Sequence, residues 1–204
     1  MMFNDILKER LPNFPMAGFG PATRQCTLAG HQDFMSVVRY VHALPYGRTS
    51  QRGNYSLVLI ESKGTCSTKH ALLASIAREH QVPIGLGMGI YPCKGENFPS
   101  VRRILDEYQL ESIPESICFL QFEDEIIDVS SPVAVPNTAD LPFFYTETIE
   151  PEQIDGYKPL IHKGFIADWA RSIGLETTYT TSELWKIRER CMRAKEREFS
   201  LAMH

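Results

Sequence analysis

The clearest hydrophobic pattern of the chain lies over residues 66–80. Ala71, Leu72 and Ile76 recur at the three- and four-residue spacing of an α-helix, and apolar neighbours widen this face enough for a buried helix. Pro83 follows soon after, and proline cannot continue the hydrogen-bond ladder of a helix. The pattern therefore predicts a buried helix over residues 66–80.

The same kind of pattern predicts the other elements. Helical spacing of apolar residues indicates helices over residues 1–11, 32–44, 100–110, 163–173 and 182–199. Apolar runs and alternation indicate strands over residues 84–91, 116–122 and 126–130. In the first strand every second residue is glycine, and we expect backbone to approach that face closely. Residues 12–21 and 131–159 lack periodicity and are rich in proline, so we expect an irregular loop and a surface-wrapping loop there.

Composition limits the classes of function. The chain has 204 residues, enough for one domain with a proper core, and its apolar fraction of 43% is ordinary for a globular protein. A net charge of −4 gives no electrostatic case for nucleic acid as a partner. No apolar run approaches the roughly 20 residues that span a bilayer, and the first ten residues lack an apolar signal core. We therefore expect a cytoplasmic protein with no membrane partner.

The five cysteines are odd in number and widely spread, which favours reduced thiols. Cys66 differs from the others because it falls in the first turn of the predicted buried helix. Free N–H groups and the positive end of the helix dipole at this position favour a thiolate, and Gly64 leaves room for a substrate or another backbone. The alternative is an inert, buried cysteine that only fills space.

The segment Gly64-Thr-Cys66, its long Ala/Leu-rich helix, the Val82-Pro83 exit and the strand after it resemble the nucleophile segment of the bacterial-type transglutaminase-like superfamily. Members of this superfamily are papain-like cysteine proteins with a Cys, His, Asp triad in that chain order. The resemblance implies an α+β fold with a transglutaminase-like core, in which the cysteine-bearing helix packs on a small antiparallel sheet. It further implies that Cys66 is a nucleophile and Asp128 the triad aspartate. The triad histidine position is occupied by Ile117, next to Cys118.

Isoleucine can neither activate a thiol nor protonate a leaving amine. His70 lies one helical turn after Cys66 and could reach back toward the thiol. His162 could fold over the site from the C-terminal part. Packed or capping histidines without a catalytic role are the alternatives at both positions. Cys118 or Cys93 could form a redox-linked pair with Cys66, or serve packing alone.

The resemblance assigns residues 30–131 to the core, residues 1–29 to an N-terminal helix and irregular loop, and residues 132–204 to a wrapping loop and C-terminal helices of the same domain. It leaves two hypotheses open. The chain is either a thiol hydrolase or acyltransferase acting on a peptide or a small amide or amine substrate, or a catalytically silent relative that binds such a partner. No metal or organic cofactor is implied, and the sequence does not give the oligomeric state.

Overall fold

The computed structural model describes residues 10–18, 20–96, 98–131 and 137–202. The chain forms a mixed α+β fold with an antiparallel four-stranded sheet in the order β3-β2-β1-β4. The strands are β1 (Gly85–Cys93), β2 (Ile113–Phe122), β3 (Glu125–Ile127) and β4 (Tyr145–Ile149). The α-helices are α2 (Pro21–Leu28), α3 (Phe34–Ala43), α4 (Leu57–Ile60), α5 (Cys66–Glu79), α6 (Pro99–Glu107), α7 (Tyr157–Ser172) and α8 (Thr181–Ala202), and short 3-10 turns lie at Thr138–Asp140, Pro151–Ile154 and Leu175–Thr177.

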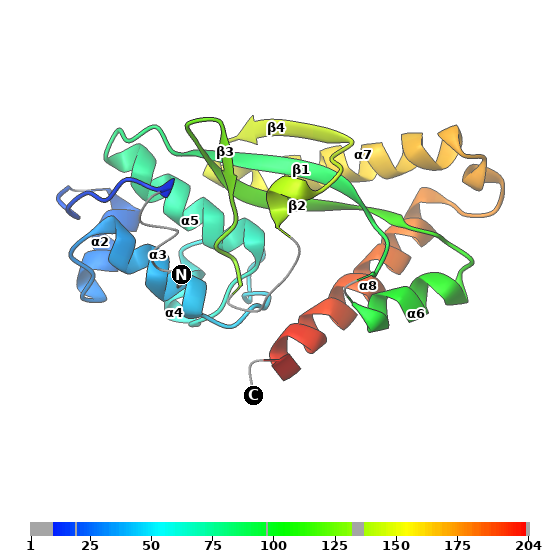
Figure 1. Cartoon of the computed structure of the whole chain (residues 1–204), viewed down its shortest axis with the longest axis horizontal. Helices are drawn as coiled ribbons and strands as arrows, with labels where there is room; N and C mark the ends of the chain where they lie inside the picture. The colour runs from blue at the N-terminus through cyan, green and yellow to red at the C-terminus, as the bar shows by residue number, and fades with distance from the viewer. Residues whose placement is uncertain (1–9, 19, 97, 132–136, 203–204) are drawn as a thin grey trace.

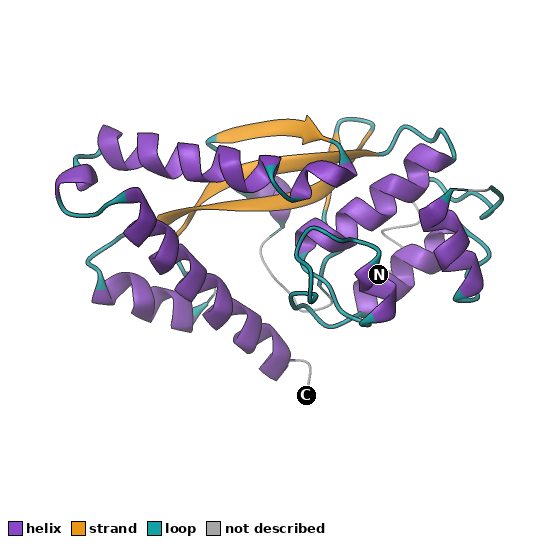
Figure 2. Ribbon diagram, turned by 180° about the vertical axis from the view of Figure 1, so that it is seen from behind, coloured by secondary structure: helices purple, strands orange, loops and turns teal. Residues whose placement is uncertain are grey.

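The sheet joins two groups of helices, as Figures 1 and 2 show from opposite sides. Helices α2, α3, α4 and α5 gather at one end, and α6 and α8 gather at the other, while α7 runs along the sheet. Each end has its own buried core. The strands β1 and β2 belong to both, since Met88 and Cys118 pair within the first core whereas Cys93 and Ile113 pair within the second. The two helical groups are thus held apart by one strand pair.

The predicted antiparallel sheet and the helix that begins at Cys66 are confirmed. The predicted helices over residues 32–44, 100–110 and 182–199 correspond to α3, α6 and α8 within a few residues. The helix predicted over residues 1–11 falls almost entirely outside the described residues. In the described part of the chain, no helix combines the length and apolar composition needed to cross a lipid bilayer.

The flanking segments differ from the sequence prediction at three points. Residues 1–29 contain the helix α2, which begins with a proline in its first turn and whose Ala22 and Thr23 N–H groups donate to the distant carboxylate of Glu79. Residues 131–159 are not one loop, because they contain β4, which pairs with β1. The helix predicted over residues 163–173 begins at Tyr157 instead, because Pro159 lies in its first turn, where the missing N–H costs nothing.

The glycine face of β1 is approached by aromatic rings and not, as we expected, by backbone. A Cβ atom on Gly87 would lie 2.2 Å from Cε2 of Phe119, and one on Gly89 would lie 2.3 Å from Cε1 of Phe143. The two rings pack against each other with centroids 5.6 Å apart, and Phe119 is fully buried. Because Phe119 is enclosed and Phe143 packs against it, the glycines leave the space in which both rings lie against the sheet.

The variant Gly87→Ala is therefore expected to lose about 1 to 3 kcal/mol of unfolding free energy through overpacking. The matched control is Gly164→Ala in α7, where the added Cβ would meet no described atom within 4 Å outside its chain neighbours and the nearby backbone of its own helix. This control is expected to gain about 0.5 to 1 kcal/mol, because glycine weakens a helix interior. Urea denaturation of both variants measures the difference, and an unchanged midpoint for Gly87→Ala would show that the rings yield.

Candidate functional site

A cavity of about 410 Å³ lies between the two groups of helices, beside the edge of β2. The strand β3 pairs only with residues 120–122 of β2, so the first part of that edge has no neighbouring strand among the described residues. Successive side chains of a strand point to opposite faces, yet Glu115, Ser116 and Ile117 all line the cavity. The cavity therefore wraps around the free edge of β2 and receives side chains from both faces.

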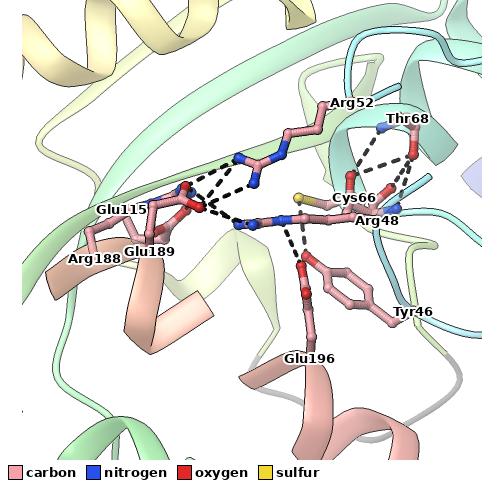
Figure 3. Close-up of polar contacts among 10 residues, drawn as sticks. Tyr46, Arg48, Arg52, Cys66, Thr68, Glu115, Arg188, Glu189 and Glu196 are labelled. Atoms are coloured by element: carbon pink, nitrogen blue, oxygen red, sulfur yellow. Dashed lines mark hydrogen bonds and ion pairs between the residues drawn. The ribbon is translucent and has the colours of Figure 1, made fainter. Parts of the chain in front are cut away.

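Cys66 lies in the wall of this cavity, at the first turn of α5. Thr65 caps the helix, and its backbone N–H and side chain exchange hydrogen bonds with Thr68. The Tyr46 hydroxyl donates toward Cys66 Sγ over 3.8 Å (Figure 3). Burial and the neighbouring thiol raise the pKa of Tyr46 well above its ordinary value, so the hydroxyl keeps the proton that it donates. The sulfur thus faces a hydroxyl donor at the positive end of a 14-residue helix.

The structure brings Cys66, Asp128 and His162 to the same cavity, and Ile117 lines it as well. His70 is fully buried and is not among the lining residues. Asp128 accepts hydrogen bonds from the Ser130 N–H and the Thr138 hydroxyl. Burial acts to raise the pKa of Asp128, but His70 and these hydrogen bonds outweigh it and hold the pKa below its ordinary value. Asp128 is therefore ionised at neutral pH.

His70 lies beside Asp128, with 3.4 Å between Nε2 and Oδ1. Its Nε2 accepts a hydrogen bond of 2.9 Å from the Val129 N–H, and its buried Nδ1 has no hydrogen-bond partner in the described part of the chain. Burial lowers the pKa of His70, so the ring is neutral and its proton sits on Nδ1. The basic nitrogen of His70 is therefore occupied by the backbone of the segment that follows β3.

His162 belongs to a hydrogen-bonded chain at the edge of β2. Its Nε2–H donates to the Pro114 carbonyl over 2.8 Å, and its Nδ1 accepts from the Ser116 hydroxyl over 3.0 Å. Lys158, one turn earlier in α7, donates from Nζ to Ser116 Oγ over 2.8 Å and to the Ser116 carbonyl over 3.3 Å. Burial lowers the pKa of His162 to about 4. The ring is neutral, and both of its nitrogens are engaged.

A network of ion pairs crosses the cavity wall (Figure 3). Arg188 of α8 binds both carboxylate oxygens of Glu115 and contacts Glu189 at 2.7 Å. Burial alone would raise the pKa of Glu115, but the Arg188 guanidinium outweighs it and holds the pKa below its ordinary value. From the loop before α4, Arg48 reaches Glu189 at 3.0 Å and Glu196 at 2.9 Å, and Arg52 reaches Glu189 at 3.3 Å. These contacts tie the cysteine side of the cavity to α8.

The other cysteines are unsuited to react. All five thiols are free, and burial raises the pKa of Cys26 and Cys191 to about 12 and that of Cys118 to about 11. Cys93 is also buried, which raises its pKa, and it lines the cavity. The four are held as thiols at neutral pH. Within the described ranges, no three His, Cys, Asp or Glu side chains gather in a way that could hold a metal ion.

Several residues of the site were missed from the sequence. Glu115 lies one residue before the strand predicted over residues 116–122, and Arg188 lies in a run of mixed charges within the helix predicted over residues 182–199, a pattern typical of a solvated helix. Lys158 lies in the segment of residues 131–159 for which the sequence predicts a loop.

A comparison of the chain with protein-family models, curated proteins and solved structures found no match. The function has to be argued from the geometry of the cavity.

Proposed function

We propose that the cavity is an active site in which Cys66 performs thiol acyl chemistry on an amide, by hydrolysis or by transfer to an amine. The observation that carries this proposal is the position of Cys66: a thiol at the N-terminus of a 14-residue helix, in a cavity wall, facing a hydroxyl donor 3.8 Å away. This is the position that the resemblance to the transglutaminase-like superfamily assigns to the nucleophile. The cavity is of a size that takes a small molecule or a short peptide segment.

In this proposal the Cys66 thiolate attacks the amide carbonyl, the C–N bond breaks, and the amine leaves with one proton, equivalent to the one that the thiol gave up. Water or a second amine then cleaves the resulting thioester, which releases the acid or the new amide and restores the thiol. The helix terminus and the Tyr46 hydroxyl stabilise the thiolate before attack. The Cys66 N–H, which the first turn of α5 leaves without a helical acceptor, contributes to the oxyanion site. Asp128 holds a negative charge in the same wall, where it can position an amine.

A second candidate is a catalytically silent cavity that binds a peptide or an amine-bearing partner. The observation that favours it is the engagement of both imidazoles. His70 accepts from the Val129 N–H, and His162 contacts Ser116 and Pro114 through its two nitrogens. Neither ring offers a free basic nitrogen to the sulfur, and Ile117 occupies the position where the resemblance places a base. Amide cleavage then requires one of these rings to exchange its partner during the reaction.

Alkylation by iodoacetamide separates the two candidates. If Cys66 is an activated nucleophile, it is expected to react at pH 7 at least about tenfold faster in the folded protein than in urea, where the same residue has ordinary reactivity. Tyr46→Phe is expected to slow this reaction severalfold by removing the donor to the sulfur. Peptide mass spectrometry gives the rate for each cysteine, and the raised pKa values of the other four keep them in the background.

The control is Tyr40→Phe, a partly buried tyrosine of α3 that packs against His31. It is expected to leave the rate at Cys66 unchanged. A thiol that reacts more slowly in the folded protein, is insensitive to Tyr46→Phe and gains reactivity only in Ile117→His would contradict the enzyme proposal. That outcome would instead support the silent cavity.

A further inference from the structure

Lys158 places a positive charge in the cavity wall, and no carboxylate of the described residues contacts its Nζ. Its side chain is 8% exposed, and its Nζ donates only to the hydroxyl and the carbonyl of Ser116 among the described residues. An ammonium group has three N–H donors, so one of them has no acceptor in the described part of the chain. Lys158 lines the cavity, which is where that donor can find a partner.

The neighbouring arginines of the cavity are already paired. Arg188 is bound by Glu115, and Arg48 and Arg52 are bound by Glu189. Glu115 also acts on Lys158 through its charge, but both of its oxygens are taken by Arg188. A buried charge is costly unless a counter-charge or a full set of hydrogen bonds accompanies it. Of the two buried cations in the described cavity wall, Arg188 has a carboxylate partner and Lys158 has none, while the half-buried Lys195 lies over the rings of Phe98 and Phe199.

Ser116 cannot supply the missing partner, because its hydroxyl is committed in a fixed direction. The Ser116 hydroxyl donates to Nδ1 of the neutral His162 and accepts from Lys158. His162 is held in turn by the Pro114 carbonyl and by a T-shaped contact with the Trp185 ring, with centroids 5.2 Å apart. These hydrogen bonds fix the ammonium group in place and leave its third N–H directed away from Ser116. A group that accepts this N–H gains a preformed, charged donor.

We propose that Lys158, held by Ser116 and His162, is the anchor for a ligand carboxylate in this cavity. This inference rests on the proposed chemistry at Cys66, which places the reacting amide. Together, the two proposals make the substrate an amide that also carries a free carboxylate. The cavity of about 410 Å³ limits it to the size of an acylated amino acid, a dipeptide or the C-terminal residues of a peptide. The carboxylate binds at Lys158, and the amide carbonyl faces Cys66.

The alternative is that Lys158 serves only to cover the free edge of β2. Carbonyls two residues apart lie on the same side of a strand, and those of Pro114 and Ser116 accept from His162 and Lys158 of α7. Such contacts protect an exposed strand edge. An edge-capping lysine contributes to stability but gives the cavity no preference between an acid and its amide, so the two roles can be separated by a ligand pair.

A series of thiol-alkylating acids tests the anchor. We would measure the alkylation of Cys66 by the N-iodoacetyl derivatives of glycine, β-alanine and γ-aminobutyrate, each beside its primary amide. The three acids differ in the length of the chain between the iodoacetyl group and the carboxylate, and they therefore test different separations of the Cys66 sulfur from Nζ of Lys158. The expected result is that the acid of at least one length reacts about tenfold faster than its amide, because a charge-assisted hydrogen bond holds it. Lys158→Gln is expected to abolish this acid-to-amide ratio, and Lys158→Arg to retain part of it.

Lys163→Gln is the matched control, because it removes the same charge one turn along α7 from an exposed side chain outside the cavity lining. It is expected to keep the acid-to-amide ratio of the wild type. Equal rates for acid and amide at every length, or a preference that Lys158→Gln leaves intact, would overturn the carboxylate anchor. Thermal unfolding of Lys158→Gln verifies that the variant is folded at the assay temperature.

Binding without reaction keeps this inference separate from the proposed chemistry. In Cys66→Ala, isothermal titration with the N-acetyl derivatives of the same three acids and amides is expected to show tighter binding of one acid, lost in the Cys66→Ala, Lys158→Gln double variant. If Cys66 proves unreactive while this preference persists, the chemistry fails and the anchor stands. If Cys66 is activated but no acid is preferred in either assay, the anchor fails and the chemistry stands.

Discussion

In the variant Arg188→Leu, the free energy of unfolding is expected to fall by about 3 to 5 kcal/mol, because the substitution leaves a buried carboxylate without its partner. Arg188 and Glu115 are each more than nine-tenths buried, and the guanidinium holds both oxygens of the carboxylate. Glu189 loses one contact as well, but it keeps Arg48 and Arg52. The cost therefore falls mainly on Glu115. Chemical denaturation at pH 7 measures it.

The double variant Glu115→Leu, Arg188→Leu is expected to recover most of this loss, since a buried ion pair contributes little beyond an apolar pair of similar volume. The matched control is Arg171→Leu, which breaks an exposed pair with Asp168 and is expected to change stability by less than about 1 kcal/mol. A loss below about 1 kcal/mol in Arg188→Leu would mean that water reaches Glu115 from the cavity. The pair would then be part of the solvated surface of the site.

The parts of the fold that could be predicted are those whose signals are local. The helix α5 combines a threonine cap, a run of good helix formers and a proline exit within some twenty residues, and the structure places Cys66 in its first turn as predicted. The strands β1 and β2 are apolar enough to be recognised from their own residues. In these segments, local preference and tertiary packing favour the same conformation.

The missed elements depend on partners far away in the sequence. In β4, Ile149 is buried but most other residues are exposed, so the strand forms through its pairing with β1 and shows no alternating apolar pattern. The helix α2 is stabilised at its start by Glu79, 56 residues or more along the chain. No window of local sequence contains such information.

The site was partly predictable for the same reason. Cys66 and Asp128 carry signals of type and position, and both line the cavity. The predicted start of α7 is six residues too late, so the prediction does not show that Lys158 and His162 share one face of one helix. The charged pattern of α8 is compatible with a solvated helix, and only the packing against β2 shows that Arg188 is buried. Which charged residues face the cavity thus depends on ion pairs between segments that are far apart in the sequence.

Lys69, the third residue after Cys66, is expected to make the largest contribution to the pH dependence of stability. Lys69 is fully buried, and its Nζ donates to the carbonyls of Leu44 and Ser130 at 2.6 Å and 2.8 Å. Burial lowers its pKa from 10.5 to about 7, although the charges of Asp128 and Cys66 act in the opposite direction. Below pH 7 the folded protein carries the buried charge, whereas between pH 7 and 10.5 only the unfolded chain holds the proton. Stability from this group therefore rises with pH across that window.

Relative to Lys69→Met, the wild type is expected to gain about 2 kcal/mol of unfolding free energy between pH 7 and pH 9. Taking the difference between the two proteins cancels the contribution of the buried tyrosines and cysteines to the pH dependence. The raised pKa values of those groups make stability fall as the pH rises further. Lys186→Met, at an exposed position of α8, is expected to show no such trend against the wild type. A flat difference for Lys69→Met would mean that Lys69 stays protonated when buried, held by Asp128 and the two carbonyls, and that the cysteine end of the cavity carries a permanent positive charge.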